Sequence, residues 1–409
     1  MSRTFLPHVI TDDSALGGSV IERSLRFNND DSAYLNRTPG SESTRRAVTL
    51  SVWIKRCNFG EQMILDAYIN DSNRTRFMID AGNRMQFFTR YSGNDHNLIT
   101  NARQRDVSGW YHFVYAINTN ESTASNRVKC YINGEQQTFT GSQYPDQEDL
   151  MFGAICSHTI GTGQDSGGNE TFYDGYMAEM HCIDGTQLDP TYFGYTDSQT
   201  GLWRPKKYTY GNYGTNGFYL NFKDNSSTSA LGKDTSGNGN DFTTNDFSVT
   251  DGKNYDSMID TPTNNFPTLN PLHDDPYSSA SYTAPTLRDG NLNYRTNTTS
   301  LNNYAESTMY FPRSGKWYIE IILSSVNIGS GVGYAQIDVA GYYLWWHYSS
   351  PYYEIQTVSG KQTIGSLSND DIIQIAYDVD SGYIWYGKNN TWYLSGDPSS
   401  GIPMSPAAQ

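Results

Sequence analysis

Hydrophobic and polar residues alternate along much of the chain, most clearly over residues 110–134. Two alternating runs, 110–117 and 127–132, enclose a polar excursion. A period of two residues is typical of a half-buried β-strand. Asn133-Gly134 follows the second run, and this pair tolerates the positive φ angles of a type I′ turn. The stretch therefore predicts a strand, a loop, a second strand and a tight turn into a third.

Short alternating runs recur between turns rich in Asn, Gly and Asp. We expect further strands at 24–27, 48–55, 62–69, 74–80, 84–91, 174–184 and 217–222, and again at 290–294, 315–322, 331–335, 371–378 and 381–389. Many short strands at this spacing favour an all-β sandwich or jelly roll.

Prolines suggest where the chain divides. Five of them fall between 251 and 285, and proline cannot donate to a sheet ladder. We therefore expect a Pro-rich interdomain linker at 251–285. The predicted organisation is an N-terminal arm at 1–18, a first sandwich with its extension at 19–250, this linker, and a second sandwich at 286–409.

The order of motifs resembles the laminin-G/concanavalin-like jelly-roll superfamily over about residues 20–195. The resemblance is carried by Trp-Tyr-His-Phe-Val at 110–114, Val-Lys-Cys-Tyr-Ile-Asn-Gly at 128–134 and Gly-Tyr-Met-Ala-Glu at 175–179, together with the strands predicted at 24–27 and 48–55. It implies an all-β fold built on an antiparallel β-sandwich.

The last part resembles a second β-sandwich family, SPRY (B30.2). The carriers are Gly-Lys-Trp-Tyr-Ile-Glu at 315–320, Gly-Val-Gly at 331–333 and a Gly-Tyr-Ile-Trp-Tyr-Gly-Lys-Asn run at 382–389. That family has at least one further strand, so we expect this sandwich to be incomplete at Gln409.

Composition narrows the function classes. The 409 residues carry a formal net charge of −15, which argues against nucleic-acid binding, and no apolar run could span a bilayer. The start of the chain lacks a signal-peptide pattern. The four cysteines show no zinc-ligand spacing, and we expect reduced, buried thiols.

The chain matches known catalytic motifs only weakly, and we expect that it is not an enzyme. Asp-Ser-Gly-Gly at 165–168 resembles a serine-protease loop, but no matching histidine motif precedes it. Glycosidases of this fold need paired carboxylates, and the Glu-x-Asp-x-x-Glu strand motif is absent. Glu179, flanked by Met177 and His181 on its own face, and Glu320 are interpreted as lone, partly buried carboxylates.

Two groups of residues are candidate binding sites. Asp165, Asn169 and Asp174 offer oxygen ligands for calcium, although Asx turns explain the same residues without a metal and are the favoured interpretation. The aromatic run at 341–353 suggests ligand binding by Trp345, Trp346 and Tyr353, with core and subunit contacts as the favoured alternative. No other cofactor is indicated.

The whole arrangement resembles large virion proteins of marine tailed phages, especially cyanophages. The match is closest over Arg23–Pro39, which reads RSLRFNNDDSAYLNRTP. The resemblance implies a tail fibre, spike or capsid-attached appendage, assembled onto the virion in the host cytoplasm. Its expected partners are virion proteins bound by the arm, a host-surface glycan and further copies in a homo-oligomer, with a trimer favoured. The alternative is a polysaccharide depolymerase.

Overall fold

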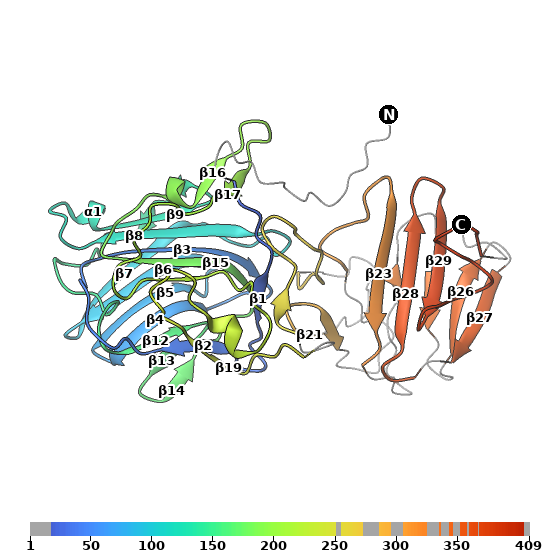
Figure 1. Ribbon diagram of the computed structural model, residues 1–409, viewed down its shortest axis with the longest axis horizontal. Helices are drawn as coiled ribbons and strands as arrows, with labels where there is room; N and C mark the ends of the chain where they lie inside the picture. Colours follow the sequence, from blue (N-terminus) through green and yellow to red (C-terminus); the bar gives the residue numbers. More distant parts are fainter. Residues whose placement is uncertain are drawn as a thin grey trace. The chain divides into compact units, whose positions relative to one another are not determined.

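The computed structural model describes residues 18–250, 255–272, 286–295, 306–324, 335–336, 343–346, 352–357, 360–366 and 368–404. Its contacts divide the chain into two compact units (Figure 1). Among the described residues, the larger unit holds 18–250, 255–271 and 288–293, and the others form the smaller unit. The predicted arm lies outside the described residues except for Gly18.

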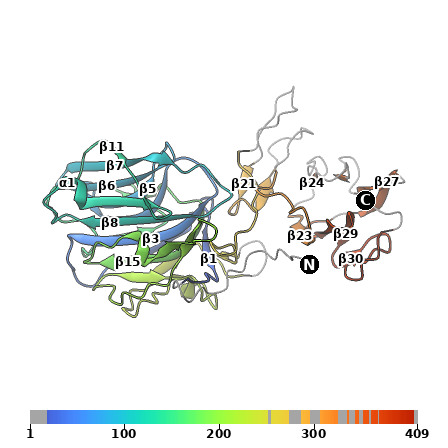
Figure 2. The same ribbon diagram turned by 90° about the horizontal axis from the view of Figure 1, so that it is seen from above.

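Two eight-stranded sheets form the larger unit, and Figure 2 shows them as separate layers. The β3 sheet has the order β10-β9-β8-β3-β15-β1-β20, with β18 also paired to β15; its strands are β1 (Ser24–Phe27), β3 (Ala47–Arg56), β8 (Tyr111–Asn118), β9 (Val128–Ile132), β10 (Glu135–Gln136), β15 (Gly175–Asp184), β18 (Phe218–Leu220) and β20 (Ser257–Met258). The β5 sheet has the order β11-β7-β6-β5-β4-β12-β2-β19, formed by β2 (Tyr34–Arg37), β4 (Gln62–Asn70), β5 (Asn73–Ile79), β6 (Arg84–Tyr91), β7 (Asn94–Arg103), β11 (Phe139–Thr140), β12 (Ser157–Ile160) and β19 (Thr243–Asn245).

Several shorter elements lie outside the two eight-stranded sheets. They are α1 (Ala124–Arg127), the 3₁₀ turns at Pro190–Tyr192 and Ser229–Gly232, and the paired strands β13 (Gly163–Asp165) with β14 (Gly168–Glu170), β16 (Gly194–Thr196) with β17 (Trp203–Pro205), and β21 (Thr286–Arg288) with β22 (Asn293–Arg295). The predicted all-β, antiparallel fold class is confirmed. No helix among the described residues has the length and hydropathy to cross a membrane.

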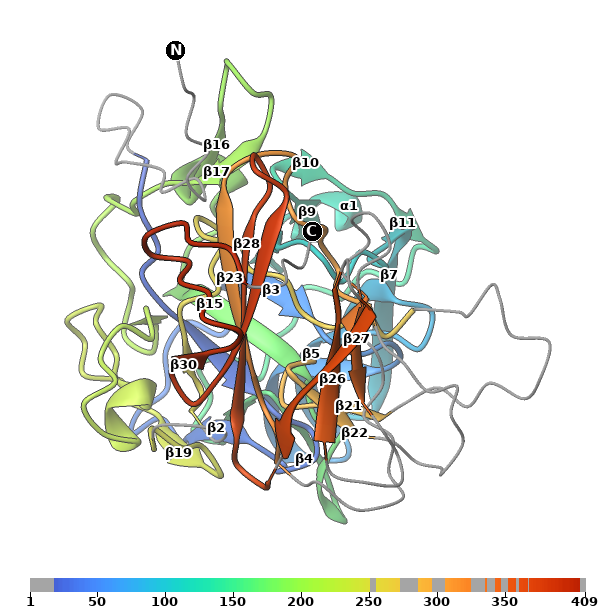
Figure 3. The same cartoon turned by 90° about the vertical axis from the view of Figure 1, so that its right-hand side faces the viewer.

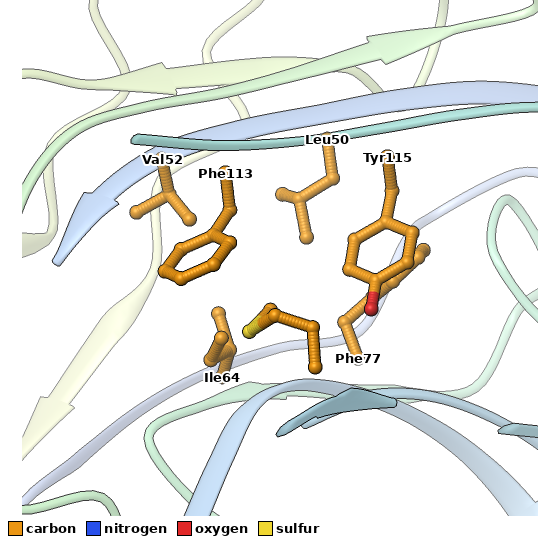
Figure 4. A pocket seen from close by; sticks show the side chains of 7 residues that line it. Leu50, Val52, Ile64, Phe77, Phe113 and Tyr115 are labelled. Atoms are coloured by element: carbon orange, nitrogen blue, oxygen red, sulfur yellow. The ribbon is translucent and has the colours of Figure 1, made fainter. Parts of the chain in front are cut away.

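The inner faces of the two sheets form one hydrophobic core. Figure 4 shows Leu50 and Tyr115 projecting from the β3 sheet toward Ile64 and Phe77 of the β5 sheet. The Phe77 and Tyr115 rings lie 4.9 Å apart, and the side chains around them leave no room for a water molecule. This part of the core therefore holds no ligand, which favours binding on an outer face or at an edge.

The predicted hairpin at 110–134 is confirmed. Asn133 has a φ of 49° and Gly134 a φ of 82°, and Glu135 pairs with Ile132 across the turn. Glycine is also required sterically, because a Cβ at residue 134 would lie 2.4 Å from the Trp203 ring. The third predicted strand instead divides: β10 stays in the β3 sheet, whereas β11 joins the β5 sheet.

Strand β15 departs from strict alternation. Its register with β3 shifts between Ala178 and His181, which marks a β-bulge, and Glu179 has a φ of 47°. Met177 and Met180 both lie in the core. The interpretation that Met177 shares a face with Glu179 is therefore wrong, because the extra residue of the bulge reverses the alternation.

Part of the predicted linker packs against the larger unit. Asp256 pairs with Arg26 at 2.9 Å and Asp260 pairs with Lys55 at 2.8 Å, and all four side chains are less than a tenth exposed. The Trp110 indole also donates to Asp260 at 3.0 Å. Residues 255–271 therefore pack against the sandwich and are held there by buried charge pairs. We call this segment the strap.

The smaller unit contains two four-stranded antiparallel sheets (Figure 3). One has the order β23 (Lys316–Ile322), β28 (Ile372–Asp378), β29 (Tyr383–Lys388), β30 (Thr391–Trp392), and the other β24 (Ala335–Gln336), β25 (Tyr343–Trp346), β26 (Tyr352–Thr357), β27 (Gly360–Ser366). Its buried core includes Ile375, Trp385 and Tyr386. The SPRY-like character of this unit and the domain boundaries stay predictions.

The four cysteines are free and buried, as expected. Burial raises the pKa of the Cys130 thiol to about 12, so the reactive thiolate is scarce at neutral pH.

Candidate functional site

The outer side of β4, β5 and β6 carries a cluster of charged and polar side chains. Strand register places Asp66 beside Arg76, and Arg76 beside Phe88, on the side opposite the core residues Phe77 and Phe87. The β13–β14 hairpin adds Gln164 and Glu170. We call the set Asp66, Tyr68, Arg74, Arg76, Phe88, Gln164 and Glu170 the polar face.

Arg76 lies at the centre of the polar face. Its Nη2 atom contacts a Glu170 oxygen at 2.9 Å and also donates to the Gln164 carbonyl. Its Nε atom lies 3.5 Å from an oxygen of Asp66. One guanidinium thus joins a sheet carboxylate to the hairpin and fixes the position of both.

Several buried polar atoms here make no hydrogen bond within the described fold. Asp66 Oδ1, Arg74 Nε, Arg76 Nε and Gln164 Oε1 are buried without a hydrogen bond. Leaving a buried polar group unsatisfied costs about 1–3 kcal/mol. Such a set is uncommon in a face that serves only for packing, because buried polar groups are normally paired.

Aromatic rings flank these charges. Arg74 stacks over the Tyr68 ring at 5.2 Å, and Arg90 stacks over the Phe88 ring at 5.5 Å. Tyr68 and Phe88 are both partly exposed. Rings beside guanidinium and carboxylate groups provide an apolar stacking surface together with hydrogen-bonding edges.

The surroundings of Asp66 favour a role in positioning the β13–β14 hairpin rather than a role in catalysis. Burial raises the pKa of Asp66 to about 6, and its Oδ2 accepts a hydrogen bond from the Gln164 N–H at 2.7 Å. The residue is completely inaccessible to solvent. A general acid has to reach the oxygen that it protonates, and Asp66 cannot do so without opening the hairpin.

A buried serine and histidine pair offers no nucleophile. Ser51 Oγ lies 2.8 Å from His112 Nε2, and the Trp203 indole donates to His112 Nδ1 at 2.9 Å. Since Nδ1 accepts, Nε2 carries the proton and donates to the serine. Burial lowers the pKa of His112 to about 3, so the ring stays neutral. The histidine therefore cannot act as a base toward Ser51.

Glu179 belongs to an aromatic network on the other sheet. The Tyr219 hydroxyl donates to Glu179 at 2.7 Å, and His181 Nδ1 lies 2.9 Å from the Tyr213 hydroxyl. Burial, reinforced by the charge of Glu179, raises the pKa of Tyr219. Glu320, in the smaller unit, is exposed rather than partly buried and accepts from Tyr318.

The predicted calcium ligands fall in two places. Asn169 pairs with Gln164 across the β13–β14 hairpin, so strand alternation directs Asp165 to the opposite face. Asp165 accepts from the Gly167 N–H at 2.7 Å, which is the Asx turn that we favoured. Asp174 lies beyond the hairpin, where burial and the charges of Asp30 and Asp289 raise its pKa to about 7. Calcium binding stays a prediction.

The predicted aromatic ligands lie in the smaller unit. The backbone register pairs Trp346 with Tyr353, and Trp345 with Glu354, between β25 and β26. Nothing more is described of these side chains, and their role in binding stays a prediction.

Sequence reasoning missed the polar face. The strands at 62–69 and 74–80 were expected, and Arg74-x-Arg76 has the period that places both side chains on one face. What the sequence does not indicate is that Gln164 and Glu170, about ninety residues further along, cover these arginines.

A profile of protein families matches residues 27–188, and it describes the concanavalin A-like lectin/glucanases superfamily. The larger unit has a laminin-G/concanavalin-like fold. The matched residues include most of this concanavalin-like unit and all seven residues of the polar face.

Solved structures to which this chain is similar are remote in sequence. A pentraxin of Limulus polyphemus has 15% identity and a TM-score of 0.33, with 41% of this chain and 78% of that chain covered. A Bacteroides ovatus protein described as carbohydrate-binding has 16% identity and a TM-score of 0.36, covering 55% and 58%. Domains LG4-5 of the mouse laminin alpha1 chain have 9% identity and a TM-score of 0.32, covering 92% and 78%. No curated protein sequence matches the chain.

Proposed function

We propose that the concanavalin-like unit binds a glycan at the polar face. The observation that carries this proposal is the placement of Arg76 between the carboxylates of Asp66 and Glu170, with partly exposed rings alongside. Sugars present hydroxyl groups that pair with such polar edges, and apolar ring faces that stack on aromatic side chains. The contacts hold these groups in place before a ligand arrives, which lowers the entropy cost of binding.

We further propose that the chain is a structural virion protein of a tailed phage, either a tail fibre, a spike or a capsid-attached appendage. The resemblance of Arg23–Pro39 to marine phage virion proteins supports this role, and these residues form β1, β2 and the turn between them. In this proposal the arm docks to other virion proteins, and the glycan belongs to the host surface. A homo-oligomer, with a trimer favoured, would present several polar faces together.

The glycan proposal is tested on the full chain with an array of bacterial surface polysaccharides. We expect Arg76→Met and Phe88→Ala to weaken binding at least tenfold, or about 1.4 kcal/mol. Arg204→Met is the matched control, because Arg204 forms a similar pair with Asp197 at 3.6 Å outside the polar face. Circular dichroism and Tm measurements establish that the variants are folded.

Two results would overturn the glycan proposal. One is wild-type binding that survives both polar-face substitutions. The other is release of reducing sugar ends from the polysaccharide, which would identify a depolymerase. The virion role is tested separately by mass spectrometry and cryo-electron microscopy of purified particles, where absence of the chain would refute it.

A further inference from the structure

A histidine and two carboxylates converge beside strand β7 of the concanavalin-like unit. His96, Asp146 and Glu148 each offer a ligand atom, and these atoms all lie within 4.8 Å of one another. His96 comes from β7, whereas the two carboxylates come from the connection between β11 and β12. The cluster is separate from the polar face, since His96 pairs with Thr89, whose side chain is fully buried.

The facing atoms of this cluster make no hydrogen bond within the described fold. His96 Nε2 and Glu148 Oε1 lie 3.1 Å apart, yet both are buried and neither makes a hydrogen bond. A single cation between the two atoms would satisfy both at once.

The separation fits two neighbouring ligands of one metal ion. Bonds of about 2.0–2.2 Å from zinc to nitrogen and oxygen place adjacent ligand atoms roughly 3.0–3.5 Å apart. Asp146 is exposed, so its carboxylate is free to complete the set from the solvent side. Imidazole with carboxylates suits zinc and neighbouring transition metals, whereas calcium takes oxygen ligands alone.

Contacts on either side hold the carboxylate segment in position. Thr119 donates to the Glu148 carbonyl at 2.7 Å, and the Met151 N–H donates to Thr75 at 3.0 Å. Arg46 contacts Asp149 at 2.5 Å. The ligand atoms are therefore positioned by bonds that do not depend on the metal.

We propose that His96, Asp146 and Glu148 bind a transition-metal dication of the zinc type. The ion ties the segment around Glu148 to strand β7, and water completes its coordination. Binding at this site is independent of glycan binding at the polar face.

The test uses the full chain, stripped with a chelator and titrated calorimetrically with Zn²⁺, with Mn²⁺ and Ca²⁺ for comparison. We expect one zinc ion to bind at this site and to raise Tm, because a ligand selective for the folded state stabilises it. His96→Gln, Glu148→Gln and Asp146→Asn should each weaken zinc binding at least about tenfold. Asp95→Asn is the matched control, since Asp95 pairs with Arg90 instead and should leave zinc binding unchanged.

Asp146→Asn keeps the test decisive if the buried substitutions prevent folding, because the Asp146 carboxylate is exposed and forms no hydrogen bond or ion pair with the described residues. The proposal is overturned if wild type and Asp146→Asn bind zinc equally. It is also overturned if zinc leaves Tm unchanged while Glu148→Gln lowers it, since His96 and Glu148 would then form only a structural ion pair.

Discussion

At the scale of single residues, burial decides how much a charge pair contributes to the stability of the fold. Lys55 is fully buried, and its ammonium group contacts Asp260, Asn265 and the Phe266 carbonyl at 2.6–2.8 Å. By contrast, the Lys223 and Glu22 pair is more than half exposed on both sides. Both pairs join residues that are distant in the sequence, and they differ mainly in their access to water.

We expect Lys55→Met to lower the unfolding free energy by about 3–5 kcal/mol, because it leaves the Asp260 carboxylate buried without its cation. Lys223→Met should cost less than about 1 kcal/mol, as is usual for exposed pairs. Chemical denaturation of the two variants measures the difference. Equal effects of the two substitutions would contradict this account of the strap.

Asp174 should make stability depend on pH. Its pKa is raised to about 7 in the folded protein, whereas an unfolded aspartate titrates near 4. Between roughly pH 4 and pH 7 the folded state binds the proton more tightly, so the unfolding free energy falls as pH rises through this window. We expect Asp174→Asn to flatten that fall and to be the more stable protein at pH 8.

Denaturation curves from pH 5 to pH 8 measure this effect. Asp224→Asn is the control, because the pKa of the exposed Asp224 is lowered and it stays ionised across the range in both states. An unchanged slope in Asp174→Asn would show that another group titrates. Adding calcium at pH 8 tests the predicted ligand role, since a bound ion would stabilise the wild type and not Asp174→Asn.

At the scale of elements, the backbone approach between β3 and β15 depends on a glycine. Gly175 has a φ of +144°, and a Cβ there would lie 2.2 Å from the Lys55 carbonyl oxygen. Gly168 has a similar φ of +122° but nothing within 4 Å of its Cβ position. We expect Gly168→Ala to cost about 1 kcal/mol for the backbone alone. Gly175→Ala should cost about 1–3 kcal/mol more because it also forces the strands apart.

Thermal unfolding of the two alanine variants isolates the steric contribution. Similar Tm values would mean that β15 shifts without penalty.

The same elements show what the sequence could predict. β1 begins and ends where the sequence predicts, and β4, β5 and β6 agree within about one or two residues, because local alternation and turn residues specify them. β7 was not anticipated, since its first half reads Asn-Asp-His-Asn and lacks an apolar face. The bulge at Glu179 and the cover that Glu170 gives to Arg76 also escaped prediction. Both depend on pairing between distant segments, which one sequence does not reveal.

At the scale of the whole molecule, the chain stays with the concanavalin-like unit beyond residue 250, and β20 within the strap forms an edge strand of the β3 sheet. The strap supplies partners for Arg26 and Lys55, and further on the Gly290 carbonyl accepts from Tyr176 at 2.7 Å while Asn291 donates to the Cys57 carbonyl. Residues 255–271 and 288–293 are therefore structural parts of this unit.

A truncation series separates these contributions. We expect a chain ending at residue 295 to unfold in a cooperative transition with nearly the Tm of the same unit in the full chain. A chain ending at 250 should lose at least about 5 kcal/mol, because two buried cations lose their carboxylates and each such loss costs about 3–5 kcal/mol. Differential scanning calorimetry of the three proteins provides the measurement. If the chain ending at 250 were as stable as the chain ending at 295, the strap would only connect the two units. The two buried charge pairs would then contribute no net stability to the fold.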